Sequence, residues 1–311
     1  MSKLRCLWDG KAELGEGVFW HEAEQSVYWV DIIRSDLYRM TTDGSVVSWH
    51  FPGGISSAAP CNTGGLLATF AKGLSHLDLD TNIATPLVAL EIDLPDNRLN
   101  DGCSDTRGQF WFGSRDNNQQ DPTGSFYCMD RVGDITRVET LGPVCISNGP
   151  AFSTDGQWIY ITHTLKKKVY RARLDQNGLA AEPELHIDFM QYEGFPDGMC
   201  SDTDGGLWIC HFAGKRVTRF LANGDVSLVI EMPVPNITKC AFGGPDLRTL
   251  YITTARTTLS EAQRKEYPLS GGLFAIDLPF CGAPMAAVTR ARGVLTGVIV
   301  KSGVQGKSIS G

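Results

Sequence analysis

The chain has 311 residues, of which 42% are hydrophobic and 20% charged, a globular composition that excludes disordered and fibrous classes. Its formal net charge of -7 and pI near 5.4 argue against a nucleic acid or another polyanion as partner, because phosphate binding needs clustered basic residues. The one basic run, Lys166-Lys167-Lys168, is interpreted as a solvated loop.

Neither a membrane segment nor a secretory leader is indicated. No stretch approaches the roughly 18 consecutive apolar residues of a membrane helix, and no apolar core follows the first five residues. Nine cysteines, an odd number without a C-x-x-C pair, are expected to be free thiols in a reducing compartment. We therefore expect a cytoplasmic protein without a membrane partner.

Six short runs of aromatic and β-branched residues recur along the chain. Their starts lie 39, 44, 49, 48 and 43 residues apart, a period typical of propeller blades with four strands each. The pattern predicts an all-β, six-bladed β-propeller with antiparallel blades, in which each run is the first apolar strand of its repeat. The runs are Val27–Val30, Leu66–Thr69, Phe110–Gly113, Ile159–Thr162, Leu207–Cys210 and Leu250–Thr253.

Turns and chain ends complete this prediction. Polar segments with glycine, such as Ser201–Gly206, precede several of the runs and are read as hairpin turns. A short helix is expected over Thr258–Tyr267, ended by Pro268. The run Gly272–Leu278 is expected to complete the final blade together with strand material from the N-terminus. Residues 1–290 are predicted to form one propeller domain, and residues 291–311 a Gly- and Ser-rich tail.

Four segments place an acid or an amide beside a glycine, just ahead of a predicted strand. The central residues, separated by 84, 48 and 49 residues, are Glu16, Asn100, Asn148 and Asp197. Because the innermost strands of all blades line one channel, residues at their entrances converge. Carboxylate and amide oxygens suit a divalent cation such as Ca²⁺, Mn²⁺, Mg²⁺ or Zn²⁺. The alternative is that each is a turn residue, since Asn-Gly and Asp-Gly are favoured turn dipeptides.

The same segments carry a family resemblance. The chain resembles the gluconolactonase, regucalcin and senescence-marker-protein family from about Leu14 to Ile276. The matching stretches are Leu14–Trp20, Val30–Ile32, Arg98–Gly102, Ser147–Ser153, Pro196–Met199 and Pro268–Phe274.

The resemblance implies a role for each candidate. Glu16, Asn148 and Asp197 would coordinate one divalent metal, with Zn²⁺, Ca²⁺ and Mn²⁺ all open, and Arg98 and Asn100 would contact the substrate. Asp197 is the candidate general base, because a carboxylate beside a metal-bound water is well placed to take its proton.

Other polar residues near the predicted strand ends are less informative. In part of the family an acidic loop residue also touches the sugar, but here that loop, Asn117–Asp121, aligns poorly. Tyr160, His163 and His211 lie near predicted strand ends, and a place in the core or at the rim is favoured over a substrate role for each.

The resemblance implies hydrolysis of a sugar-acid lactone in carbohydrate catabolism. In this reaction the metal polarises the carbonyl and activates water. Two alternatives stay open: a hydrolase of broader ester or organophosphate substrates, and a non-catalytic calcium-binding propeller. The expected partner is a small sugar lactone, not a nucleic acid. The sequence leaves open which lactone is used, which metal is native and how many copies assemble.

Overall fold

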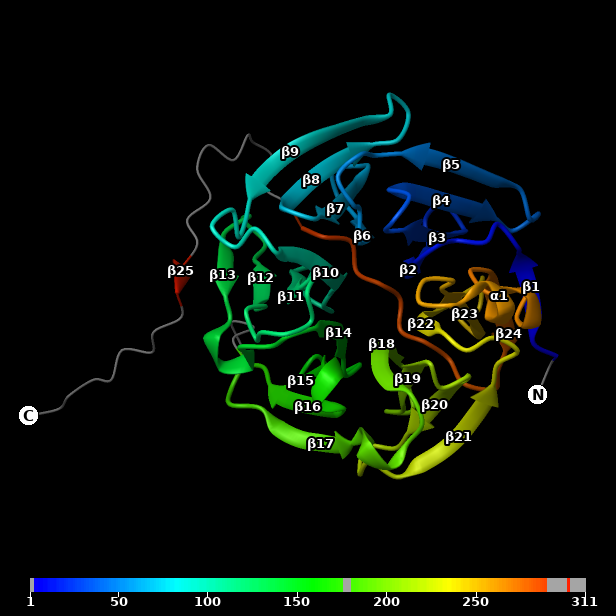
Figure 1. Ribbon diagram of the computed structural model, residues 1–311. Helices are drawn as coiled ribbons and strands as arrows, with labels where there is room; N and C mark the ends of the chain where they lie inside the picture. Colours follow the sequence, from blue (N-terminus) through cyan, green and yellow to red (C-terminus); the bar gives the residue numbers. More distant parts are fainter. Residues whose placement is uncertain (1–2, 176–179, 290–300, 303–311) are drawn as a thin grey trace, which may run out of the picture.

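Six β-sheets surround a central axis in the computed structural model, which describes residues 3–175, 180–289 and 301–302. Figure 1 shows the sheets as blades of a closed ring, with β2, β6, β10, β14, β18 and β22 nearest the axis. Strands within each blade are antiparallel and follow one another outward in chain order, apart from the last blade and one added outer strand. The predicted all-β, six-bladed propeller is confirmed.

Each blade begins at the axis and ends at the periphery. The first blade contains β2 (Gly15–His21), β3 (Ser26–Asp31), β4 (Asp36–Thr41) and β5 (Val46–His50). The second contains β6 (Ser57–Pro60), β7 (Leu66–Phe70), β8 (Gly73–Asp78) and β9 (Ile83–Ala89). The third contains β10 (Asn97–Ser104), β11 (Phe110–Asp116), β12 (Phe126–Met129) and β13 (Ile135–Arg137).

The other three blades repeat this arrangement. The fourth contains β14 (Ser147–Phe152), β15 (Trp158–His163), β16 (Lys168–Arg173) and β17 (Glu184–Asp188). The fifth contains β18 (Phe195–Ser201), β19 (Leu207–Phe212), β20 (Arg216–Phe220) and β21 (Val226–Glu231). The sixth contains β22 (Ile237–Gly243), β23 (Thr249–Thr254), β24 (Leu273–Asp277) and, outermost, β1 (Arg5–Trp8). An N-terminal strand therefore closes the final blade, as predicted.

The six apolar runs are the second strands of their blades, β3, β7, β11, β15, β19 and β23, and not the first as expected from the sequence. An inner strand precedes each one. These inner strands mix glycine, proline and polar residues, as in Ser147-Asn148-Gly149-Pro150, so their strand character is hard to recognise from apolar content. The predicted helix is present as α1 (Glu261–Glu266), shorter than expected because Ser260 caps it with a hydrogen bond from the backbone of Gln263.

The core consists of clusters between neighbouring blades. Trp208 and Val217 of the fifth blade, for example, pack with Ile252 and Phe274 of the sixth. Each sheet is therefore covered on both faces, which explains why the second strands are nearly continuous apolar runs.

After β24 the chain crosses the ring. Residues 278–289, here called the strap, run from the sixth blade past the channel to the second and third blades (Figure 1). Val288 donates its backbone N–H to Pro60 O at 2.7 Å, and Thr289 donates to Gly108 O at 2.9 Å. The strap thus connects blades on opposite sides of the ring.

Beyond the strap little of the chain is described. The predicted tail, residues 291–311, lies outside the described residues except for β25 (Lys301–Ser302), which pairs in parallel with β13. The domain boundary near residue 290 stays a prediction. Among the described residues, every helix is too short or too polar to cross a membrane.

Candidate active site

The inner strands are irregular where the candidate residues lie. In five of the six blades the pairing of the inner strand with its neighbour shifts register, in β2, β10, β14, β18 and β22. The shifts fall at Glu16–Phe19, Leu99–Gly102, Asn148–Ala151 and Pro196–Met199 in the first four of these strands. Such bulges re-aim side chains and recur beside functional sites. The acid-glycine and amide-glycine pairs are therefore parts of bulged inner strands, and the alternative that each is a turn residue is wrong.

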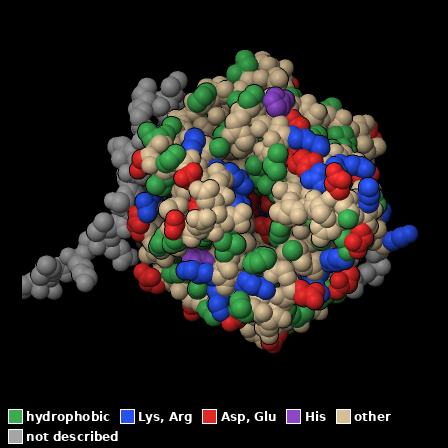
Figure 2. All heavy atoms as spheres, in the orientation of Figure 1, with side chains coloured by type: hydrophobic (Ala, Val, Ile, Leu, Met, Phe, Trp, Pro, Cys, Tyr) green, Lys and Arg blue, Asp and Glu red, His purple; other side chains and the backbone are tan. Residues whose placement is uncertain are grey.

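All five predicted site residues line one cavity of about 520 Å³ at one end of the channel. They are Glu16, Arg98, Asn100, Asn148 and Asp197, from four different blades. In Figure 2 basic and acidic side chains are visible in the hollow at the centre of the ring. The convergence expected from the blade spacing is observed.

Glu16 is held in place by the start of the first blade. Gly17 beside it adopts φ 58° and donates its backbone N–H to Glu16 Oε2 at 3.0 Å. The buried carboxylate of Asp31 accepts backbone N–H groups of Glu13 and Leu14 at 2.8 and 3.2 Å, and so fixes the segment that leads into β2. This contact gives Asp31, in the Val30–Ile32 stretch of the family pattern, a structural role.

Asn100 and Asn148 are oriented by a chain of hydrogen bonds. Asn100 Nδ2 donates to Ser147 O at 2.7 Å and to Asn148 Oδ1 at 2.8 Å. Asn148 Nδ2 donates to Thr164 Oγ1 at 3.0 Å, and Thr164 Oγ1 donates to Pro196 O at 3.0 Å. Both N–H groups of the Asn100 amide are used, so its oxygen is the atom left for a ligand. Thr164, a residue that sequence reasoning missed, links the fourth blade to the strand that carries Asp197.

The two carboxylates of the cavity are buried and close enough to influence each other. Glu16 is 7% exposed and Asp197 6% exposed. Burial, followed by the charge of Asp101, raises the pKa of Glu16 to about 8. Burial, followed by the charges of Glu16 and Asp101, raises the pKa of Asp197 well above its ordinary value. Two adjacent buried carboxylates favour protonation or a bound cation.

The residues present fit a divalent cation. Within the described part of the chain, Asp197 has neither a hydrogen bond nor an ion pair, and Glu16 has only the N–H of Gly17. An unpaired buried carboxylate is costly unless a positive charge or donor meets it. No group of three or more His, Cys, Asp or Glu side chains gathers among the described residues, and the predicted set has only two carboxylates with an amide. Its donors are all oxygens, the preference of hard and borderline cations.

The loop after β11 contributes amides, not an acid, to the cavity. Asn117 and Gln119 line it, whereas Asp121 lines a separate depression beside Asp116. The Asp116 carboxylate accepts backbone N–H groups of the loop, including those of Gln120 at 2.9 Å and Asp121 at 3.0 Å.

A second arginine was missed in the sequence. Arg115 of β11 lies opposite Arg98 of β10, and both line the cavity. Burial, followed by the charge of Arg115, lowers the pKa of Arg98 to about 9. Burial also lowers the pKa of Arg115. Because the turn at residues 105–109 connects β10 to β11, the sequence indicates that Arg98 and Arg115 lie near each other. The bulge in β10 determines that both side chains point to the same side of the sheet.

An ion pair crosses the channel next to the cavity. Lys239 of β22 donates to the Asp101 carboxylate of β10, and both side chains are buried. Burial lowers the pKa of Lys239, but the charge and hydrogen bond of Asp101 together with the charges of Cys103 and Glu16 outweigh this effect and raise it. This pair was also missed, because its members are 138 residues apart.

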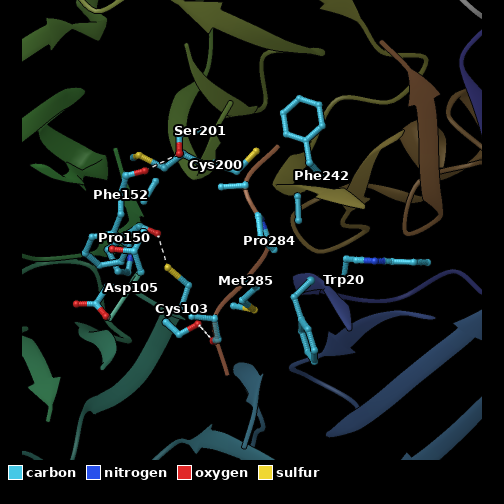
Figure 3. Close-up of a pocket in the computed structure, with 18 of the residues that line it drawn as sticks. Trp20, Cys103, Asp105, Pro150, Phe152, Cys200, Ser201, Phe242, Pro284 and Met285 are labelled. Carbon is cyan, nitrogen blue, oxygen red and sulfur yellow. Dashed lines mark hydrogen bonds between the residues drawn. The ribbon is translucent and has the colours of Figure 1, made fainter. Parts of the chain in front are cut away.

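The far end of the channel holds a smaller cavity of about 120 Å³. Figure 3 shows Pro284 and Met285 of the strap between Trp20 and Phe242 on one side and Cys103 and Pro150 on the other. The strap therefore lies across the channel end opposite the candidate site.

Three weaker candidates lie outside the candidate-site cavity. The side chains of Tyr160, His163 and His211 are not among its lining residues. His211 Nδ1 is within 2.9 Å of Glu193 O, and its ring lies 4.5 Å from that of Phe189. Free thiols are found at Cys6, Cys103, Cys128, Cys145, Cys200, Cys210, Cys240 and Cys281.

The sequence from residue 14 to residue 256 matches the family described as SMP-30/Gluconolactonase/LRE-like region. The chain belongs to this family. A 6-deoxy-6-sulfogluconolactonase of Pseudomonas putida is 34% identical over 91% of this chain and 98% of its own length. An L-arabinolactonase of Azospirillum brasilense is 32% identical over 90% of this chain and 93% of its own length.

A solved family structure shares the whole fold. The calcium-binding protein regucalcin of Agrobacterium tumefaciens superposes with a TM-score of 0.88 at 28% identity, covering 92% of this chain and 97% of that one. Membership in the SMP-30/gluconolactonase family, predicted from the motifs, is confirmed. So is the enzyme class at the level of the family, whose characterised relatives include lactonases, hydrolases of carboxylic esters.

Proposed function

We propose that the protein hydrolyses a sugar-acid lactone to the free acid with the help of one divalent cation. The observation that supports it best is the cavity at the channel end, where two buried carboxylates, without ion pairs among the described residues, meet two arginines and four side-chain amides. The lactonase relatives act on different sugars by their names, so the particular sugar is left to experiment.

Glu16, Asn148 and Asp197 would hold the cation, each through a side-chain oxygen. When bound, the cation supplies positive charge that polarises the lactone carbonyl and lowers the pKa of water. Whether it is Zn²⁺, Ca²⁺ or Mn²⁺ is part of the proposal to be tested.

Asp197 is proposed as the general base. Its carboxylate lies in the cavity and has no hydrogen bond or ion pair with the described residues, so it is free to accept a proton from the attacking water. A cation nearby favours the ionised form that this role needs, in opposition to the burial that raises its pKa.

Arg98 and Asn100 are proposed to position the sugar. Arg98 uses one N–H, on Nη1, for Leu99 O at 3.1 Å, which leaves other guanidinium donors for oxygens of the lactone. The Asn100 oxygen can accept a sugar hydroxyl, since its own N–H groups are already used.

The test is acid release from a panel of aldonolactones by protein stripped of metal and then resupplied with Zn²⁺, Mn²⁺ or Ca²⁺. Asp197→Ala is expected to lower turnover by roughly 10²- to 10⁴-fold and to weaken metal binding measured by calorimetry. Arg98→Ala is expected to lower turnover while the metal still binds. Asp121→Asn, which removes an acid outside the cavity, is the matched control and should keep full activity.

Other outcomes separate the alternatives. Metal-dependent hydrolysis of simple esters or organophosphates in place of lactones would favour the broader hydrolase. Tight Ca²⁺ binding with no hydrolysis of any of these compounds would favour a non-catalytic calcium-binding propeller, a reading suggested by the name of the Agrobacterium tumefaciens relative. The cytoplasmic location also stays a prediction.

A further inference from the structure

Two arginines face each other across neighbouring strands inside the cavity. Arg98 of β10 and Arg115 of β11 are direct partners in the antiparallel ladder, and both line the cavity. Directly opposite residues have Cβ atoms about 4.5 to 5.5 Å apart, and like charges at such positions are destabilising. The pair therefore weakens this hairpin unless something negative lies beside it.

Neither arginine has a carboxylate partner within ion-pair distance in the part of the chain that the structure describes. Arg98 donates only to Leu99 O at 3.1 Å, and Arg115 donates through Nε only to Asp116 O at 3.4 Å. Each guanidinium carries five N–H donors, so most donors of the pair are unused.

A buried arginine elsewhere in the ring shows the contrast. Arg219 donates through Nε and Nη2 to both oxygens of Asp202, at 2.6 and 3.1 Å. In that place the protein itself supplies a carboxylate that binds the guanidinium in a bidentate manner. At the Arg98 and Arg115 pair it supplies none, although Asp116 is the next residue, because the Asp116 carboxylate is bound to backbone N–H groups of its own loop.

The charges that line the cavity also indicate that the arginine pair lacks a negative partner. The acids that face the pair from other blades are Glu16 and Asp197. A divalent cation held by these two carboxylates would balance their charge and leave the two arginines without a compensating negative charge. A lactone ring is neutral and cannot compensate them.

We propose that the substrate lactone carries a second, anionic group, such as a sulfonate, carboxylate or phosphate, and that Arg115 together with Arg98 binds it. This inference rests on the proposed lactonase function and narrows its substrate class. Arg115 is then a specificity-determining residue. The cavity of about 520 Å³ falls within the size of sites that hold small-molecule ligands, roughly 300 to 1,000 Å³, so a substituted sugar lactone has room in it.

The test measures binding without turnover. The probes are 1,5-anhydroglucitol, a ring that lacks the lactone carbonyl, and its derivatives with a sulfonate, a carboxylate or a phosphate at C6. Calorimetric titration gives Kd for each, with metal-free protein and with protein loaded with Ca²⁺ or Zn²⁺. At least one anionic probe is expected to bind ten- to a hundredfold more tightly than the neutral one. The probe that binds most tightly identifies the kind of anion.

Variants assign the effect to the arginine. Arg115→Gln is expected to remove the preference for the anion by ten- to a hundredfold and to change the neutral probe less than twofold. Arg115→Lys should keep part of the preference, since charge remains but the two-pronged geometry is lost. Arg173→Gln removes the same charge from outside the cavity and should bind as the unaltered protein does. Thermal unfolding checks that each variant is folded.

The results separate two kinds of failure. If the neutral probe binds as tightly as every anionic one, or if Arg115→Gln weakens all probes equally, the inference is wrong even where lactones are hydrolysed. If the preference depends on Arg115 but no lactone, neutral or anionic, is hydrolysed by the metal-loaded protein, the anion site stands and the lactonase proposal fails.

Discussion

Buried charge is the main feature of the site at the scale of single residues. Among the described residues, Glu16 and Asp197 face Arg98 and Arg115 in the cavity without forming an ion pair, whereas Asp101 next to them is paired with Lys239. The protein thus neutralises one of three neighbouring carboxylates and leaves the other two available. An unpaired buried carboxylate is retained at a cost to stability, which is typical of functional positions.

This arrangement predicts how stability depends on pH when metal is removed. The pKa of Glu16 is raised from 4.5 to about 8 in the folded protein. Between these pH values the unfolded chain loses the Glu16 proton while the folded protein keeps it, so the free energy of unfolding falls as the pH rises. Urea unfolding of metal-stripped protein from pH 5 to pH 8 measures this effect.

Glu16→Gln is the control for that experiment, because it removes the titrating group and keeps the shape. Its free energy of unfolding should fall less steeply over the same pH range. Adding the metal to the unaltered protein should reverse the loss, since a cation favours the ionised carboxylate. Identical slopes for the two proteins would show that Glu16 is not the group responsible.

At the scale of elements, the bulged inner strands combine strand pairing with a binding site. In β18 the bulge sets two residues, Asp197 and Gly198, against the single residue Cys210 of β19. Gly198 allows close approach to the neighbouring inner strand: a Cβ there would lie 2.7 Å from Lys239 Cγ and 2.8 Å from Thr238 O. The glycine of this motif is therefore needed for packing, and the acid beside it is carried into the cavity.

Gly198→Ala tests this packing. The added methyl group meets a backbone oxygen that cannot move easily, so the variant should lose about 1 to 3 kcal/mol of stability in urea unfolding. Gly142→Ala is the matched control, because its Cβ would meet nothing closer than 3.9 Å. A loss at Gly198 no larger than that at Gly142 would contradict the argument.

At the scale of the whole molecule, the ring depends on its closure. β1 is the outermost strand of the sixth blade, and Trp8 at its end packs against the first blade, 5.2 Å from Trp29 and 4.8 Å from Tyr38 between ring centroids. One residue thus joins the strand that closes the ring to the blade that begins it. Across the ring, the strap connects the sixth blade to the second and third blades by backbone hydrogen bonds.

Trp8→Ala is expected to destabilise the protein by about 3 kcal/mol, as large aromatic truncations in packed sites do. Leu7→Ala changes the neighbouring residue of the same strand, whose side chain is 37% exposed, and should cost little. Chemical unfolding of both variants measures the difference. Equal losses would mean that Trp8 does not hold the closure together.

Much of this architecture is determined by local pattern. The number of blades follows from six apolar runs at a period in the forties, because a strand buried on both faces needs a continuous apolar run wherever it lies. Glu16, Asn100, Asn148 and Asp197 follow from motifs at blade spacing, since equivalent positions of inner strands converge on one axis. Arg98 was implied by the family resemblance.

Only the tertiary structure decided the contacts that depend on register and on distant strands. Arg115 faces Arg98 because the bulge in β10 sets which side of the strand each residue points to, and one residue more or less would reverse it. Lys239 reaches Asp101 from across the channel, and the strap crosses its far end. These contacts join residues far apart in the chain, and no periodic pattern encodes them, because each depends on how the complete ring closes.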